Sequence, residues 1–145
     1  VYNIGGIRAA LTKGPVTFGD INEIAPFENK IAFTTLSGNK VLELFRQIAK
    51  RGGEGVSHGV ELVITADGQL HSARLHGQEI DPQKDYRVVT IDYIVQAFRD
   101  GSNLVSPQNE SDNSRFIIVN YFKMMTEQGK TVDAQIEGRI KLLDE

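Results

Sequence analysis

The stretch Val60–Leu75, VELVITADGQLHSARL, places two apolar-rich runs on either side of Asp67-Gly68. Runs of this length that are rich in valine, isoleucine and leucine favour strands. An Asp-Gly pair between two such runs favours a type I′ turn that joins antiparallel strands. We therefore predict a β-hairpin here. The other helices and strands are predicted from the sequence on either side of it.

Two helices are predicted on the N-terminal side of this hairpin. Residues Asn39–Lys50 follow Ser37, a favourable N-cap residue, and carry apolar side chains at helical spacing. The apolar positions are Val41, Leu42, Phe45, Ile48 and Ala49. A shorter helix is expected to begin after Thr17, with Asp20 completing a capping box, and to end before Pro26.

Further strands and one more helix complete the pattern. Strands are predicted at Lys30–Leu36 and Tyr86–Ile91, and Ser114 is expected to cap a last amphipathic helix that ends at Gly129. Residues 132–140 are expected to add a terminal strand or strand pair. Hairpins and helices interleave without a repeated βαβ pattern, so the predicted fold class is α+β, with mixed or antiparallel sheets and helices outside.

Composition narrows the classes of function. The chain has 145 residues, a common size for one domain, and one domain is expected. Its net charge is −3 and it has no block of consecutive lysines or arginines, which argues against nucleic acid as a partner. The longest apolar run is far shorter than the ~20 residues of a membrane span. The absence of cysteine excludes disulfides and thiolate chemistry.

The three histidines do not form a metal-binding pattern. His71 and His76 are five residues apart, which on a strand puts them on opposite faces, and His58 lies in a glycine-rich loop. No HxH or HExxH motif accompanies them. We expect no metal site in this chain.

The opening stretch Asn3-Ile4-Gly5-Gly6-Ile7-Arg8 is a candidate ligand loop. Glycines leave no Cβ in the way, so their backbone N–H groups can approach a bound group. Asn3 offers an amide, and Arg8 offers a planar guanidinium suited to phosphate or carboxylate. The alternative is ordinary turn chemistry. Phe27 and Asn29 are open to the same two interpretations, as a core aromatic and a turn residue or as parts of a site.

Several landmarks follow one another in a fixed order. They are Asn3-x-Gly5-Gly6-Ile7-Arg8, Thr17 with Asp20, Pro26-Phe27-x-Asn29, Ser37-Gly38, Gly77, Asp81-Pro82, Tyr86-Arg87-Val88, Asp92-Tyr93, Asp100-Gly101 and Glu137-Gly138-Arg139-Ile140. Together they resemble the C-terminal domain of the 5′-nucleotidase and UDP-sugar hydrolase family over nearly the whole chain. The resemblance implies one such domain over residues 1–145, layered α/β/β/α, that lacks the family's first helix and part of its first strand.

In that family a separate N-terminal metallophosphatase domain holds two divalent metal ions and performs hydrolysis. The resemblance therefore implies that this chain recognises a nucleoside or nucleotide and presents its phosphate to such a domain, on the same or another chain. No catalytic residue, metal ligand or cofactor is expected here, and the chain is not expected to be catalytic alone. The resemblance also implies a periplasmic, cell-surface or secreted protein that acts in nucleotide catabolism.

The resemblance also assigns roles within the substrate site. Phe27 and Tyr93 would clamp the base, Asp100 would accept hydrogen bonds from ribose hydroxyls, Arg8 would lie near phosphate or ribose, and Asn3 would lie beside the base. Stacking on an aromatic face contributes about 1–3 kcal/mol per base. The complete implied set is Asn3, Gly5, Gly6, Arg8, Phe27, Asn29, Tyr93 and Asp100.

One departure from the family leaves a second hypothesis open. The family usually has Gly-Gly-Asp-Gly around the ribose aspartate, whereas this chain has Phe98-Arg99-Asp100-Gly101 and one extra residue after Tyr93. Bulk at Arg99 could fill the ribose site and leave a binding or scaffold module that no longer takes nucleotides. A third hypothesis, an independent hydrolase that uses aspartate or histidine, lacks the motifs of such enzymes.

Overall fold

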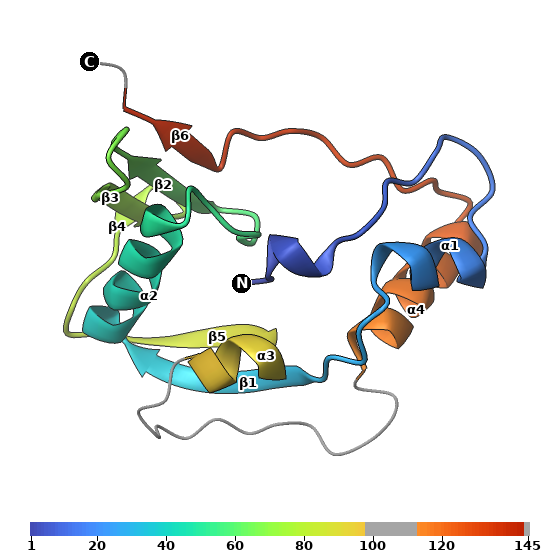
Figure 1. The fold of residues 1–145 in the computed structure, drawn as a ribbon, viewed down its shortest axis with the longest axis horizontal. Helices are drawn as coiled ribbons and strands as arrows, with labels where there is room; N and C mark the ends of the chain where they lie inside the picture. Colours follow the sequence, from blue (N-terminus) through green and yellow to red (C-terminus); the bar gives the residue numbers. More distant parts are fainter. Residues whose placement is uncertain (98–112, 144–145) are drawn as a thin grey trace. The chain divides into compact units, whose positions relative to one another are not determined.

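A computed structural model describes residues 1–97 and 113–143. The described part of the chain is α+β, as the sequence predicts (Figure 1). In chain order the elements are the 3-10 helix η1 (Ile4–Gly6), α1 (Phe18–Ile24), β1 (Ile31–Ser37), α2 (Gly38–Lys50), β2 (Val60–Ile64), β3 (Leu70–Leu75), β4 (Gln78–Glu79), β5 (Asp85–Ile91), α3 (Asp92–Ala97), α4 (Ser114–Glu127) and β6 (Ile140–Leu142). None of these helices is long and apolar enough to cross a membrane.

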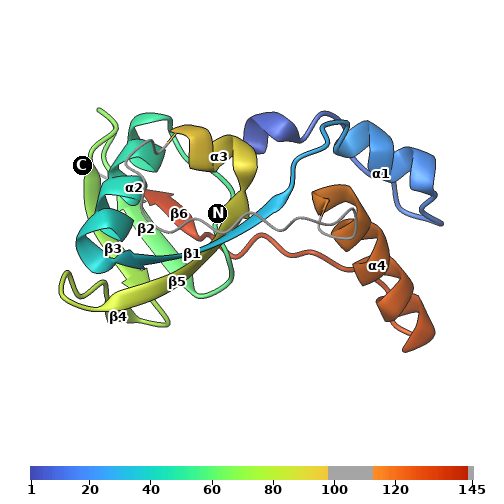
Figure 2. The same cartoon turned by 90° about the horizontal axis from the view of Figure 1, so that it is seen from below.

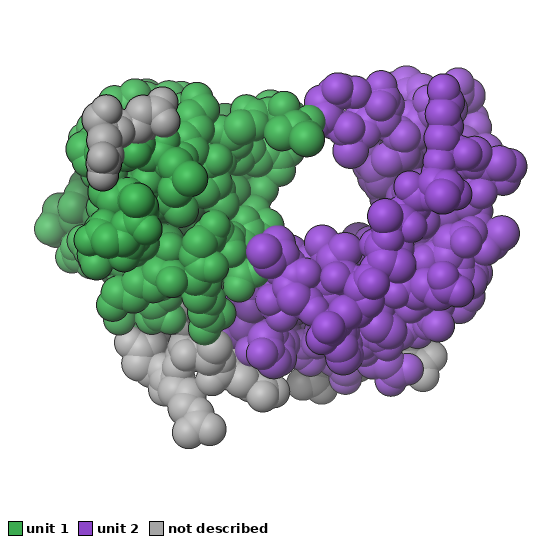
Figure 3. Space-filling view, turned by 45° about the horizontal axis from the view of Figure 1, so that its top comes forward, with its two compact units in different colours: residues 1, 34–88, 136–145 green, residues 2–33, 89–135 purple. Residues whose placement is uncertain are grey.

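The chain divides into two compact units, coloured separately in Figure 3. Unit 1 contains residues 1, 34–88 and 136–145, and unit 2 contains residues 2–33 and 89–135. From its length we predict that the chain forms one domain. In the structure, each of the two units has buried residues of its own. Both units combine segments that are far apart in the sequence. The four-layer order implied by the family resemblance stays a prediction.

Unit 1 contains a mixed four-stranded sheet, helix α2 and parts of β1 and β5, which pair in a separate two-stranded sheet. The strand order of the four-stranded sheet is β4-β3-β2-β6, in which β3 is antiparallel to both of its neighbours and β6 is parallel to β2. Helix α2 packs against β3 (Figures 1 and 2). The buried side chains of α2, β2 and β3 include Val41, Leu44, Phe45, Ile48, Leu62, Ile64 and Ala73. Leu44 takes the buried position that the sequence assigned to Leu42, which is only half-buried.

The β2–β3 hairpin is confirmed, but its turn is not of type I′. A type I′ turn needs positive φ at both central residues, and here Gly68 has a φ of +79° whereas Asp67 does not lie in that region. The Gly68 N–H donates to the Thr65 carbonyl at 2.9 Å, and the Thr65 N–H donates to the Gln69 carbonyl at 2.9 Å. The loop therefore has three residues, and only its glycine adopts the left-handed conformation.

Helix α1 begins as the capping box predicts. The Asp20 N–H donates to the Thr17 hydroxyl at 3.2 Å, and the Thr17 N–H donates to the Asp20 carboxylate at 2.7 Å. The hydrogen bond from the Thr17 side chain, followed by the one from its backbone, lowers the pKa of Asp20. The helix ends at Ile24, with Ala25 as its C-cap before Pro26.

The predicted caps of α2 and α4 are confirmed only in part. Ser37 is the N-cap residue of α2, as predicted, but its side chain makes no capping hydrogen bond. The N–H of Gly38 donates instead to the Lys84 carbonyl at 2.7 Å, so a distant loop satisfies the start of this helix. Helix α4 is capped by Asn113 rather than Ser114, because the Asn113 side chain accepts a hydrogen bond from the backbone of Arg115.

The Glu137-Gly138-Arg139-Ile140 landmark is structural. Arg139 donates to the Glu137 carboxylate at 2.8 Å and to the Val56 carbonyl at 2.6 Å, and the Glu137 carboxylate also contacts His58 at 3.0 Å. Gly138 has a φ of +64°, which suits glycine. Of the predicted terminal strands only Ile140–Leu142 forms, as β6. The motif therefore fixes the last strand of unit 1.

We predict that the ion pairs of Glu137 contribute to the free energy of unfolding and that this contribution is lost in acid. The Arg139 side chain, followed by His58, holds the pKa of Glu137 below its ordinary value. A carboxylate with a lowered folded pKa stabilises the fold above its unfolded pKa, and this stabilisation is lost as pH falls through the folded pKa. Glu137→Gln should therefore lower the free energy of unfolding near neutral pH, and the difference from wild type should shrink on acidification.

Urea unfolding from about neutral pH down to about pH 3 would measure that difference. Glu61→Gln, at an exposed position of β2, is the matched control and should show a small effect. A Glu137→Gln effect that stayed constant across the whole pH range would contradict the prediction.

Unit 2 contains helices α1, α3 and α4. Helices α1 and α4 lie side by side (Figures 1 and 2), and the rings of Phe18 and Phe116 are 6.1 Å apart between their centroids. Ile21 of α1 and Ile91 of β5 are almost fully buried. The packed helices α1 and α4 therefore adjoin the loops between η1 and β1.

Candidate functional site

The opening glycine loop is folded onto itself. Asn3 is the N-cap of η1, and its Oδ1 accepts a hydrogen bond from the Gly5 N–H at 3.0 Å. The Gly6 N–H donates to the Asn3 carbonyl, and the Ile7 N–H donates to the Ile4 carbonyl, each at 3.0 Å. Neither glycine has a positive φ. The N–H groups of Gly5 and Gly6 are therefore used within a local 3-10 turn, as the alternative of ordinary turn chemistry expects, and a role of these glycines in substrate binding stays a prediction.

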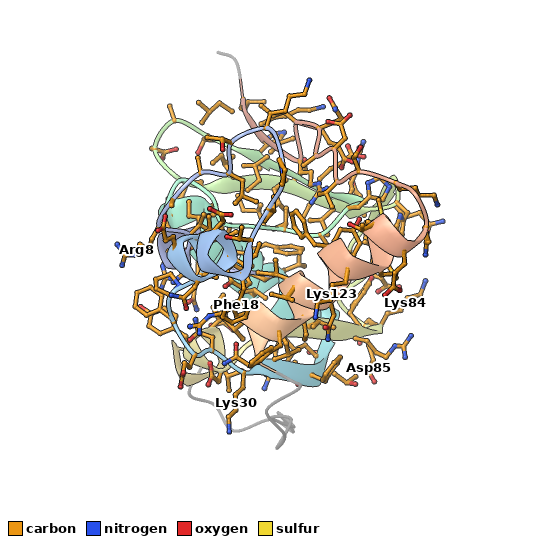
Figure 4. All side chains as sticks on the ribbon, turned by 90° about the vertical axis from the view of Figure 1, so that its right-hand side faces the viewer. Arg8, Phe18, Lys30, Lys84, Asp85 and Lys123 are labelled. Atoms are coloured by element: carbon orange, nitrogen blue, oxygen red, sulfur yellow. The ribbon has the colours of Figure 1, made fainter. Side chains whose placement is uncertain are left out.

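Arg8 leaves this loop and lies over Phe27. Its backbone N–H donates to the Ile24 carbonyl at 2.9 Å, which joins the loop to the end of α1. Its guanidinium carbon lies 5.3 Å from the centroid of the Phe27 ring, within the range of a cation–π contact. The Arg8 side chain is exposed and points away from the ribbon (Figure 4). Two segments of the predicted site therefore meet here.

The backbone around Phe27 is held by the start of α4. The Arg115 guanidinium donates to the Ala25 carbonyl at 3.0 Å through Nε and to the Pro26 carbonyl at 2.7 Å through Nη2. On the other side of Phe27, the Asn29 carbonyl accepts from the Ser114 N–H at 2.9 Å. Sequence reasoning missed Arg115, because its partners are about ninety residues away and no local pattern marks it.

The start of α3 lies beside the same segment. The Asp92 N–H donates to the Lys30 carbonyl at 2.9 Å, so Tyr93 follows directly after a residue that is bonded to the Phe27 segment. Phe27 is 45% exposed and Tyr93 is 56% exposed, although large aromatic side chains are usually more deeply buried. The structure therefore offers two open aromatic rings on neighbouring segments.

Two further residues of the predicted site are Asn29 and Asp100. Asp100, with Phe98 and Arg99, lies outside the described residues. Asn29 contributes its backbone carbonyl to the contact with Ser114, and its side chain is half-buried. Among residues 1–97 and 113–143, no group of three or more histidine, aspartate or glutamate side chains could hold a metal ion.

The landmarks of the sequence divide between two roles. Those in unit 1 fix the backbone: the Tyr86 hydroxyl accepts from the Asp81 N–H at 2.8 Å, and Gly38 packs against Asp81 and Pro82. Those in unit 2 bring Arg8, Phe27 and Tyr93 to exposed positions. The structure is thus an α+β domain that exposes Phe27, with Arg8 over its ring, and Tyr93.

Comparison with known proteins identifies the family. Residues 1–104 match the family described as "5'-nucleotidase, C-terminal domain". The chain belongs to this family, as the ordered landmarks predict. Arg8, Phe27 and Tyr93 all fall within the matched part.

Similar proteins are longer than this chain. It is 28% identical to an apyrase of Tabanus yao over 99% of this chain and 29% of the relative. It is 25% identical to the protein UshA of Salmonella pullorum over 92% of this chain and 25% of the relative. The chain is also similar to a solved structure, the 5'-nucleotidase precursor of Thermus thermophilus, with a TM-score of 0.77 and 22% identity. The match covers 99% of this chain and 31% of the Thermus thermophilus chain. The chain thus spans between a quarter and a third of these proteins.

Proposed function

We propose that this chain binds the nucleoside part of a nucleotide and presents its phosphate to a separate metallophosphatase domain or chain. The observation that carries the proposal is the pair of half-exposed aromatic rings, Phe27 and Tyr93, on backbone segments that are fixed by hydrogen bonds. An exposed aromatic ring that is rigidly held offers a planar base a large contact area at little cost in conformational entropy.

The position of Arg8 indicates how a ligand would be oriented in the proposed site. The Arg8 guanidinium covers one face of the Phe27 ring, so a base would stack on the other face. The guanidinium is also a planar donor suited to the ribose or phosphate of a ligand. The Oδ1 atom of Asn3 already accepts from Gly5, so the amide nitrogen is the end of this side chain suited to an acceptor on the base.

The remaining roles are proposed from the family. Asp100 would accept hydrogen bonds from the ribose hydroxyls, and two divalent metal ions would belong to the partner domain that performs hydrolysis. A role in nucleotide catabolism outside the cytoplasm, in the periplasm or at the cell surface, is likewise proposed from the family. In this arrangement the described chain supplies recognition and no reacting group.

Titration of the full-length protein with adenosine, AMP and ribose 5-phosphate, followed by NMR, would test this function. Binding led by stacking predicts that adenosine and AMP shift the ring signals of Phe27 and Tyr93. Signals of Tyr121, an exposed tyrosine of α4, should stay in place. Ribose 5-phosphate, which has no base, should bind much more weakly. If adenosine and AMP cause no shifts up to millimolar concentration, the alternative of a scaffold module without a nucleotide pocket replaces this proposal.

A further inference from the structure

We propose that Arg115 is a positioning residue that holds Phe27 in its ligand-binding orientation. The inference rests on the proposed nucleoside binding and adds to it a residue that touches no part of the ligand. Arg115 acts on the backbone next to Phe27, whereas Arg8 lies over the ring itself.

The contact geometry supports this role. Nε of Arg115 donates to the carbonyl of Ala25 at 3.0 Å, and Nη2 donates to the carbonyl of Pro26 at 2.7 Å. Two parallel donors of one planar group fix the direction of the two acceptors as well as their distance. Pro26 directly precedes Phe27, so the peptide that leads into the aromatic residue is held by a side chain from another helix.

The same helix holds the other side of Phe27. The Ser114 N–H donates to the Asn29 carbonyl at 2.9 Å, and Lys30 forms an isolated antiparallel bridge with Asn113. The backbone is therefore attached to the start of α4 both before and after Phe27. Phe27 is 45% exposed, so packing of the ring restrains it less than it would a core residue, and the backbone attachments become the main restraint.

The local sequence explains why an external donor is needed. Helix α1 ends at Ile24 with Ala25 as its C-cap, and the last carbonyls of a helix have no partner within the helix. Proline at position 26 prevents the helix from continuing and has no N–H of its own. A guanidinium supplies two donors in a fixed geometry, whereas a lysine ammonium is a point charge that could not reproduce the planar pair.

A double-mutant cycle with Phe27 tests the proposal on the full-length protein. The affinity for adenosine would be measured by NMR titration for wild type, Arg115→Ala, Phe27→Ala and the double variant. If Arg115 acts through Phe27, Arg115→Ala should weaken binding about tenfold in the wild-type background and less than twofold in the Phe27→Ala background. A general loss of stability would weaken binding by the same factor in both backgrounds, and that result would overturn the proposal.

Arg115→Lys keeps the charge and removes the planar pair of donors. This variant tests the proposal if Arg115→Ala does not fold. It should show a smaller loss of affinity than Arg115→Ala, together with faster exchange of the backbone amide of Ala25, which donates to the Ile21 carbonyl at 3.0 Å. Affinity and exchange like those of wild type in Arg115→Lys would count against the proposal. Arg46→Ala, at an exposed position of α2, is the matched control and should bind adenosine like wild type.

The two proposals can fail separately. If Phe27→Ala does not change the affinity for adenosine, the nucleoside site itself is wrong. If Phe27→Ala weakens binding but Arg115→Ala binds like wild type, the site stands and only the positioning role of Arg115 is rejected.

Discussion

Replacing both Phe27 and Tyr93 by alanine should remove most of the affinity for nucleosides. Each ring that stacks on a base contributes about 1–3 kcal/mol, so two rings contribute about 2–6 kcal/mol. Even the lower value corresponds to roughly a 30-fold increase in Kd. Calorimetric titration of the full-length protein with adenosine would measure the change. Because both rings are about half exposed, their removal should leave the fold nearly as stable as before.

The matched control removes the same two residue types from other exposed positions. Phe33 of β1 is 52% exposed and Tyr121 of α4 is 47% exposed, so Phe33→Ala with Tyr121→Ala removes a similar area of aromatic surface. This control should bind adenosine like wild type. Equal affinity of the Phe27 and Tyr93 double variant and wild type would reject the aromatic clamp. Equal losses in the test variant and the control would show that stability, rather than stacking, determines the affinity.

Gly38→Ala should cost about 3–5 kcal/mol of unfolding free energy. A Cβ on Gly38 would lie 2.7 Å from the Asp81 carbonyl carbon and 2.9 Å from the Pro82 Cα, and closer still to the Asp81 oxygen. These neighbours are backbone atoms, so a change of rotamer cannot relieve the overlap. Separating the two segments would also break the 2.7 Å hydrogen bond from Gly38 to Lys84 that starts α2.

Chemical denaturation would measure this loss, with Gly19→Ala as the matched control. Gly19 lies in α1, and a Cβ there would be 3.5 Å from the Thr17 hydroxyl, which is an ordinary contact. Because alanine favours helices over glycine by about 1 kcal/mol, this control should be neutral or stabilising. A Gly38→Ala variant that unfolds at the wild-type denaturant concentration would show that the loop at Asp81-Pro82 can move freely.

The sequence alone was sufficient for features that depend on near neighbours. The hairpin around Gly68, the capping box of Thr17 with Asp20 and the end of α1 before Pro26 are all present. Each depends on residues within a few positions, where backbone propensity and local hydrogen bonds dominate. The ordered landmarks also identified the family, because their spacing is preserved along the chain.

The sequence could not select the hydrogen-bond partner where several acceptors are chemically suitable. Ser37 has the right chemistry for an N-cap, but the carbonyl of Lys84 reaches the start of α2. The glycines after Asn3 could have cradled an anion, but their N–H groups bond within the 3-10 turn. In both places several acceptors are chemically suitable, and only the three-dimensional arrangement selects one.

The sequence by itself determined the α+β class, the family and the identities of the aromatic residues at the proposed site. Tertiary structure alone decided that Arg8 lies over Phe27 and that Arg115 holds the backbone beside it. The physical reason is the range of the interactions. Helix caps and turns are encoded by residues a few positions apart, whereas the contacts of these guanidinium groups join segments that meet only after the chain has folded.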